Sequence, residues 1–244
     1  MLANALYASG LVSRAHAERA VARYAPALGA AYGEWTRRKL GLFSEASSPA
    51  LGGGPAVLGG HPLAGALLEA MQRDGADFTN TWRALASVPL EPEEGEREAA
   101  AAAAAAGAPS SSSSSSPGHG LPSALARALA PSKALSTPER AAEWRAWVSA
   151  WRAALRAEGG LARDDAARQR LQRSASPKFV PRQHLLQAAI AAAEAGDASE
   201  LESLLAVVTR PYDEHDGSDG LPAADAKYCS PPPPAFSCML SCSS

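Results

Sequence analysis

Large apolar residues recur at intervals of three and four along much of this chain, and this spacing constrains the fold more than any other feature. The clearest run consists of Trp144, Trp147, Val148, Trp151 and Leu155. Residues at this spacing lie on one face of an α-helix, whereas a half-buried strand would alternate at every second residue. Three tryptophans on one stripe could stack on a ligand, but such stripes more often pack inside a protein, so we predict a core.

Composition supports helices held together by few large side chains. Hydrophobic residues make up 46% of the chain, but alanine supplies much of this share and aromatic residues only 6%. Alanine forms helices well and buries little area. We therefore predict a mainly α fold of irregular helical hairpins. The net charge of −2 gives no sign of nucleic-acid binding, and no apolar run reaches the roughly 20 residues that span a membrane.

The first helical segment is expected between about residues 2 and 42. Its apolar face consists of residues at helical spacing: Tyr24, Leu28, Ala31, Tyr32 and Trp35. Pro26 should kink or split this helix, because proline lacks the backbone N–H and clashes with the preceding turn. Gly41, which follows three cationic residues, should end the helix.

Turn and cap residues predict the helices that follow. Pro62 suits the first turn of a second helix, and Asp77 is a predicted N-cap of a short third one, which should pair with the second as an antiparallel hairpin. Thr137, followed by proline and glutamate, predicts the start of the tryptophan-bearing helix. Asp197 with Glu200 resembles a capping box before another helix.

These signals divide the chain into four parts. Helical segments are predicted over residues 1–88 and 121–213, and a proline-rich tail over 214–244. Between the helical segments, residues 89–120 hold an acidic cluster, an alanine run and seven consecutive serines. Such a composition buries too little apolar area to offset the ordering entropy, so we predict a disordered insertion with at most transient helix in its alanine run.

The sequence contains no motif for a complete active site. It has no glycine-rich phosphate loop and no kinase-like set of catalytic residues. We therefore predict no catalytic, cofactor-binding or metal-ligating residue in this chain. A zinc site would need His215 together with the three cysteines, Cys229, Cys238 and Cys242, but their spacing fits no known zinc motif. Cys242 is the redox candidate, because a thiol two residues from the terminus and flanked by serines can reach a distant partner.

Several short stretches, taken in order, resemble the C-terminal region of the selenoprotein O family of kinase-like protein adenylyltransferases. The stretches that carry the resemblance are Arg37–Leu42, Asp77–Leu85, Pro177–Arg182, Gln187–Ile190, Ala195–Asp197 with Glu200–Leu201, Arg210–Asp213, and the terminal Ser241–Ser244. Each stretch is weak by itself. Their order, ending on Cys-Ser-Ser, is specific.

The resemblance implies an enzyme that transfers AMP from ATP to Ser, Thr or Tyr hydroxyls of proteins on a pseudokinase scaffold, with Mg²⁺ or Mn²⁺. The family's ATP and metal ligands would lie in a kinase-like core outside this chain, which would be the partner of the helices here. The chain by itself is expected to be inactive. Cys242 matches the family's terminal selenocysteine or cysteine. The resemblance also implies a soluble intracellular protein and leaves a mitochondrial or other organellar address open.

Two other functions stay open at this point. The chain could be a free-standing helical interaction module that binds a partner protein. It could also be a small thiol-redox protein that uses Cys238 and Cys242, although these lack the Cys-x-x-Cys arrangement at a helix start. Of these interpretations, we expect the chain to be the C-terminal part of an adenylyltransferase, in which it has a supporting or regulatory role.

Overall fold

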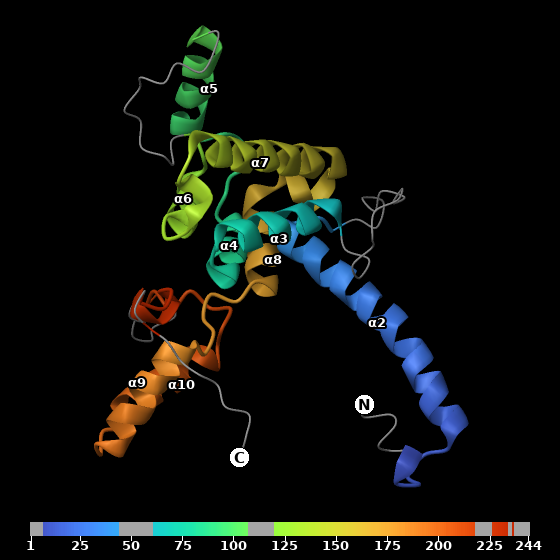
Figure 1. Cartoon of the computed structure of the whole chain (residues 1–244). Helices are drawn as coiled ribbons and strands as arrows, with labels where there is room; N and C mark the ends of the chain where they lie inside the picture. Colours follow the sequence, from blue (N-terminus) through green and yellow to red (C-terminus); the bar gives the residue numbers. More distant parts are fainter. Residues whose placement is uncertain (1–6, 44–60, 107–119, 218–225, 234–235, 237–244) are drawn as a thin grey trace.

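The computed structural model describes residues 7–43, 61–106, 120–217, 226–233 and 236. In these residues the chain is mainly helical and has no β-strand, as predicted. Nine α-helices occur in them (Figure 1): α2 (Arg14–Leu40), α3 (Pro62–Asp74), α4 (Phe78–Leu85), α5 (Glu94–Ala106), α6 (Ser123–Leu129), α7 (Pro138–Glu158), α8 (Asp165–Ala175), α9 (Gln183–Glu194) and α10 (Ser199–Val208). None of the described helices is long and apolar enough to cross a membrane.

The starts of three helices agree with their cap residues. Thr137 precedes α7, and its hydroxyl accepts the Arg140 N–H at 3.3 Å. The Asp77 carboxylate accepts the Asn80 N–H at 2.8 Å at the start of α4. Pro62 occupies the first turn of α3, where a missing N–H costs nothing.

Two helix ends also follow the prediction. Gly41 ends α2, and Gly75, which the sequence also favours as the end of the second helix, ends α3; their φ angles are 78° and 67°. These are left-handed conformations that a side chain disfavours. Pro26 does not split α2, which runs unbroken from Arg14 to Leu40. The surrounding turns retain their hydrogen bonds and hold the helix across the proline.

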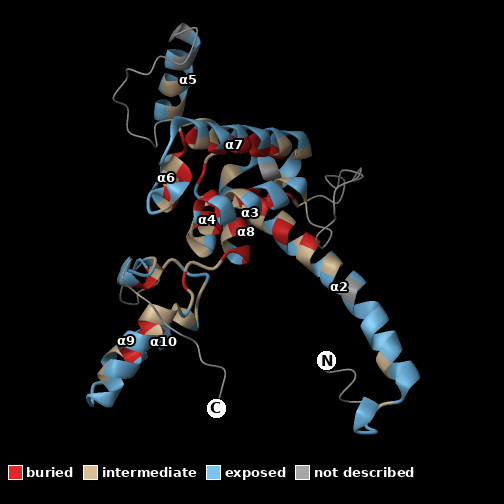
Figure 2. Cartoon of the chain, viewed as in Figure 1, coloured by how far each residue is buried: buried red, intermediate tan, exposed pale blue. Residues whose placement is uncertain are grey.

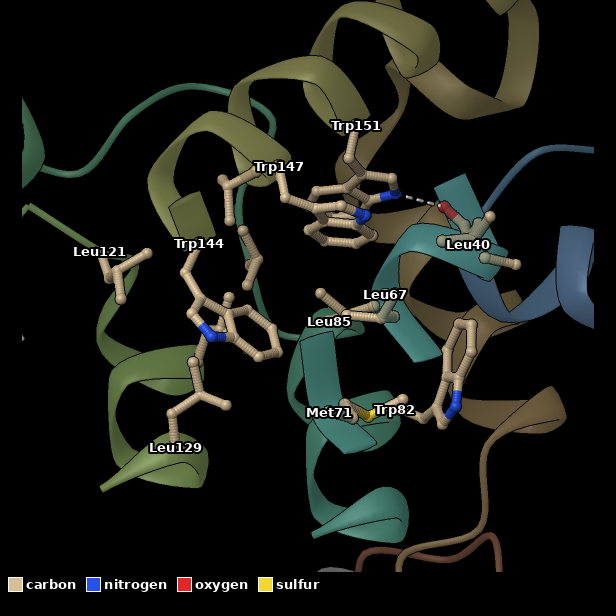
Figure 3. Packing of buried hydrophobic residues seen from close by; sticks show 14 of the residues in the cluster. Leu40, Leu67, Met71, Trp82, Leu85, Leu121, Leu129, Trp144, Trp147 and Trp151 are labelled. Atoms are coloured by element: carbon tan, nitrogen blue, oxygen red, sulfur yellow. Dashed lines mark hydrogen bonds between the residues drawn. The ribbon is translucent and has the colours of Figure 1, made fainter. Parts of the chain in front are cut away.

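The main hydrophobic core forms where α3, α4, α6, α7 and the end of α2 meet (Figure 3). Trp144, Trp147 and Trp151 of α7 point into it and are 1%, 9% and 0% exposed. The Trp151 indole N–H donates to the Leu40 carbonyl at 2.8 Å, so its polar atom is satisfied inside the core. The prediction that the tryptophan stripe forms a core is confirmed.

Helices α3 and α4 do not form the predicted antiparallel hairpin. Instead, α4 packs mainly against α6, and α3 packs mainly against α7. The short link at Gly75 and Ala76 allows either arrangement. The large side chains decide between them, because Trp82 and Leu85 of α4 are buried in the core that α6 helps to enclose.

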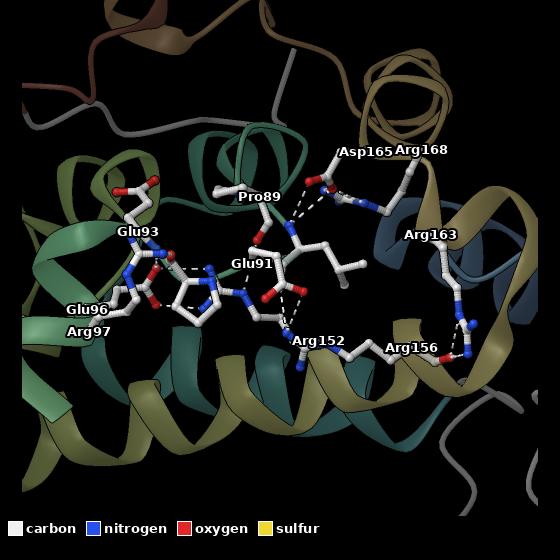
Figure 4. A network of polar contacts seen from close by, with 12 residues as sticks. Pro89, Glu91, Glu93, Glu96, Arg97, Arg152, Arg156, Arg163, Asp165 and Arg168 are labelled. Carbon is white, nitrogen blue, oxygen red and sulfur yellow. Dashed lines mark hydrogen bonds and ion pairs between the residues drawn. The ribbon is translucent and has the colours of Figure 1, made fainter. Parts of the chain in front are cut away.

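Helix α5 lies inside segment 89–120, for which the sequence predicted disorder. Arg152 of α7 holds its first turn, donating to the two carboxylate oxygens of Glu96 at 2.7 and 2.9 Å (Figure 4). Both side chains are less than a tenth exposed. Glu93 also accepts the Ser123 N–H at 2.8 Å. These contacts anchor the helix at one end, while residues 107–119 lie outside the described part of the chain.

A second, smaller core holds α9 and α10 together. Phe179, Leu185, Ala189, Leu204, Val207 and Tyr228 form it. At the turn between the helices, Asp197 accepts the Ser199 N–H at 2.9 Å, but the predicted capping box with Glu200 is absent. Glu200 instead pairs with Lys227 at 2.7 Å, because the chain returns past α10 after residue 225 and brings a cation within reach.

Candidate functional site

A cluster of charged side chains lies where the α9–α10 hairpin joins the rest of the helices, and we call it the polar junction. Arg83 of α4 is at its centre. Its guanidinium donates to the carbonyls of Arg173, Ser176 and Tyr212 at 3.0, 2.8 and 3.2 Å, and to the Glu214 carboxylate at 2.5 Å. One side chain thereby ties together α4, the end of α8 and the segment that follows α10. The planar array of donors on arginine suits this task.

Glu214 is the carboxylate on which three cations converge. It contacts Arg83 at 2.5 Å, Lys178 at 3.2 Å and Arg173 at 3.4 Å. Burial alone would raise the pKa of Glu214, but the charge of Arg83 and the Lys178 hydrogen bond outweigh it, so this pKa lies below its usual value of 4.5. The carboxylate is therefore ionised at neutral pH and balances part of the positive charge around it.

A second ion pair completes the polar junction. Arg182 donates to the two Asp77 carboxylate oxygens at 2.5 and 3.1 Å and to the Asn80 side-chain oxygen at 3.3 Å. The Asn80 amide donates to the Cys229 carbonyl at 2.9 Å. Burial of Asp77 would raise its pKa, but the Arg182 hydrogen bond and the backbone N–H of Asn80 lower it below 3.8. Asp77 therefore serves as both a helix cap and an ion-pair partner.

The polar junction gathers residues from three of the stretches that carry the family resemblance. The stretch Asp77–Leu85 contributes Asp77, Asn80 and Arg83. The stretch Pro177–Arg182 contributes Lys178 and Arg182, and Arg210–Asp213 contributes Tyr212. The chemistry of these contacts is structural, since each charge is used to join segments distant in sequence. Reasoning from the sequence did not identify this meeting point or Glu214. The one signal that could have indicated the polar junction is that all three stretches contain charged residues.

The cysteines and His215, which the sequence offered as metal ligands or redox groups, do not form a site in the described residues. Cys238 and Cys242 lie outside the described residues. Cys229 is a half-buried free thiol whose pKa burial raises, against the opposing charges of Lys178 and Arg182. The His215 Nε2 atom lies 2.9 Å from the Arg210 carbonyl, so the ring serves the local turn. In the described ranges no three His, Cys, Asp or Glu side chains gather in a way that could hold a metal ion.

Lys39 is an unusual lysine that the sequence did not single out beyond its place in the first matched stretch. Burial lowers its pKa from 10.5 to about 8. Its Nζ atom lies 5.8 Å from the centre of the Trp82 ring, which favours the charged form through a cation–π contact. This contact connects the end of α2 to α4.

Comparison with known proteins gives relatives over nearly the whole chain, although no family model matches it. The chain is 34% identical over 237 positions, 94% of its length, to a Burkholderia thailandensis protein named protein nucleotidyltransferase YdiU. It is 32% identical over 215 positions to a Pectobacterium atrosepticum protein of the same name. A third relative with this name, from Cupriavidus pinatubonensis, is 42% identical over 103 positions.

The match covers about a third of the length of the first two relatives, 35% and 34%, and 18% of the third. At 32–34% identity over most of its residues, the chain therefore has homologues among the bacterial protein nucleotidyltransferases named YdiU, which are the bacterial selenoprotein O family.

Proposed function

We propose that this chain corresponds to the C-terminal helical part of a protein nucleotidyltransferase that transfers AMP from ATP to Ser, Thr or Tyr hydroxyls of proteins. The observation that carries the proposal is the similarity over 94% of this chain to a nucleotidyltransferase of about three times its length. The role proposed for the chain is to support a kinase-like core. ATP and Mg²⁺ or Mn²⁺ are assigned to that core, so no step of the transfer is assigned to residues here.

The exposed face of α2 supports this assignment of a partner. Except at its C-terminal end, α2 extends away from the other helices and is largely exposed (Figure 1 and Figure 2). Tyr24, Leu28 and Trp35 on the predicted apolar face are 67%, 38% and 47% exposed. A row of large apolar side chains facing water is typical of a surface that another structure covers. In the proposal, the kinase-like core is that structure.

A chimeric enzyme tests the proposal. The matching region of the Burkholderia thailandensis protein is replaced by this chain in one version and deleted in another. Transfer of labelled AMP to protein is then measured with ATP and Mg²⁺. We expect the chimera to retain transfer and the deletion to lose it, because the helices would support the catalytic part.

The controls separate a supporting role from general damage. Each version is first checked by circular dichroism and gel filtration, so that only folded, monodisperse protein is compared. A deletion that is folded and fully active would contradict the supporting role. A folded chimera without activity would contradict the equivalence of the two regions and favour a free-standing interaction module.

We also propose that Cys242 is a redox-active thiol, on the strength of its match to the family's terminal position. In a longer protein its sulfur would form a labile disulfide with a cysteine of the core, formed by loss of two electrons to a cellular oxidant and broken by a thiol reductant. Peptide mapping of the non-reduced, full-length protein tests this. Equal alkylation of Cys242 and Cys238, with no effect of reductant on activity, would contradict it.

A further inference from the structure

The described residues form two units with separate hydrophobic cores. The helical body comprises residues 33–42, 61–90 and 121–175, and the C-terminal lobe comprises residues 177–217 and 226–230. Every buried residue of the larger cluster lies in the body, and every buried residue of the smaller cluster lies in the lobe. Among the described residues, no apolar cluster therefore bridges the two units. Burial of apolar surface fixes the helices within each unit but does not fix one unit to the other.

One short stretch of backbone connects the units. Helix α8 ends at Ala175, and the lobe begins at Pro177. After α10 the chain remains in the lobe, where Lys178 and Phe179 donate their backbone N–H groups to the Pro211 carbonyl at 2.7 and 3.3 Å. Ser176 is the single residue between α8 and the lobe. It is fully buried, and its carbonyl accepts a hydrogen bond from Arg83 at 2.8 Å, so the polar junction holds this connection as well as the lobe.

Three cations of the polar junction converge on a single carboxylate, in addition to the hydrogen bonds to backbone carbonyls that also cross the junction. Arg83 of α4 and Arg173 of α8 belong to the body, and Lys178 belongs to the lobe. Glu214 attracts all three. Without its negative charge, Lys178 would face two body cations with no carboxylate between them, so attraction across the junction would turn into repulsion.

The remaining ion pair cannot replace Glu214. Arg182 of the lobe and Asp77 of the body form a pair with good geometry. This pair balances its own charges and leaves the three cations around Glu214 unpaired. The Arg182–Asp77 pair would keep the lobe close to the body, whereas Glu214 fixes the orientation of the lobe relative to the body.

We propose that the C-terminal lobe pivots about Ser176 and is locked onto the body by the charge of Glu214. With Glu214 ionised, the lobe takes one orientation. When that charge is lost or its cations are taken by another anion, the lobe moves as an intact unit. Residues 231–233, which follow the lobe directly, would be carried with it. This device acts on the chain itself and does not depend on the proposed nucleotidyl transfer.

Distance measurements between spin labels test the proposal. Labels are placed at Ser149 of α7 and Ala188 of α9, two exposed positions in different units, after the three native cysteines are replaced by serine. The variant is Glu214→Gln, which keeps the shape and removes the charge. The matched control is Glu202→Gln, the same change at an exposed residue of the lobe.

We expect one narrow distance distribution for the unchanged chain and for Glu202→Gln, and loss of the narrow peak for Glu214→Gln. Hydrogen exchange of α9 and α10 should stay the same in all three, since the lobe keeps its core. All five tryptophans precede the hinge, so their fluorescence reports whether the body stays folded. A narrow peak in Glu214→Gln would overturn the proposal. Broadening accompanied by fast exchange in α9 and α10 would equally overturn it, because the lobe would then unfold instead of pivoting.

Discussion

Arg168 of α8 is a charged residue with no exposed surface. Its guanidinium donates to the Val88 carbonyl at 2.7 Å and to the Gln172 side chain at 2.5 Å. It also donates to the Asp165 carboxylate at 2.5 Å (Figure 4). It also lies 5.6 Å from the centre of the Trp151 ring. A buried cation is tolerated when its N–H groups are satisfied in this way. Arg168 thereby connects α8 to the segment after α4 and to the tryptophan core.

Replacing Arg168 by methionine should lower the free energy of unfolding by about 2–4 kcal/mol, because it leaves the buried Val88 carbonyl without its donor and removes the cation that pairs with Asp165. Urea denaturation followed by tryptophan fluorescence measures the change. Arg170→Met, at an exposed position on the same helix, is the control and should change little. Equal effects of the two substitutions would show that the buried contacts contribute nothing measurable.

Asp74 predicts how the stability of the body depends on pH. Its buried carboxylate accepts hydrogen bonds from Arg73 at 2.9 Å and Trp144 at 2.8 Å and pairs with Arg140. The Arg73 hydrogen bond, despite the opposing effect of burial, lowers the pKa of Asp74 below 3.8. A carboxyl group whose pKa is lower in the folded state stabilises the fold at pH values above its pKa in the unfolded state. This stabilisation is lost as the pH falls through its pKa in the folded state.

Asp74→Asn should therefore be less stable than the unchanged chain at neutral pH, and the difference should shrink as the pH falls from about 4 toward about 2. Thermal unfolding monitored by tryptophan fluorescence across this range gives the comparison. Asn keeps the shape of the side chain, so the charge is the main quantity that changes. A stability difference that does not vary with pH would show that the charge of Asp74 is unimportant.

At the scale of elements, two glycines with similar backbone conformations end helices in different surroundings. A Cβ atom on Gly41 would lie 3.0 Å from Gln172 Cδ and 3.1 Å from Arg168 Cγ, both in buried side chains of α8. A Cβ atom on Gly75 would meet nothing within 4 Å. Gly41 is therefore needed both for its conformation and for the close approach of α2 to α8.

Gly75→Ala should cost about 1 kcal/mol, which is the penalty for a side chain in the left-handed region. Gly41→Ala should cost more, about 2–3 kcal/mol, because packing at α8 must also shift. Urea denaturation of both variants separates the two contributions, since the conformational penalty is common to them. Similar costs at both positions would show that the α2–α8 contact adapts freely.

At the scale of the whole molecule, the exposed face of α2 predicts self-association of the isolated chain. Tyr24, Leu28 and Trp35 would bury apolar area if two chains met through this face. We expect the apparent mass in sedimentation velocity to rise with concentration. Leu28→Gln combined with Tyr24→Gln should reduce the association. A monodisperse monomer at all concentrations would contradict the prediction that this apolar face of α2 associates with another protein surface.

The sequence by itself determined most of the helices, several of their ends and the core face of α7, but not α5, which lies in a segment predicted to be disordered. Spacing fixes which face of a helix is apolar, and caps such as Thr137, Asp77 and Gly41 act within a few residues, so both are readable locally. The prediction failed where distant residues decide. Glu200, for example, pairs with Lys227, 27 residues away, instead of completing a capping box.

Only the tertiary structure decided how the helices meet and what the matched stretches do. Trp82 and Leu85 set α4 against α6, and Arg152 anchors the start of α5 through Glu96. The polar junction joins Arg83 to Glu214, which are 131 residues apart. An ion pair between such distant positions has no local signature, because its energy depends on burial and on the geometry of both partners in the folded chain.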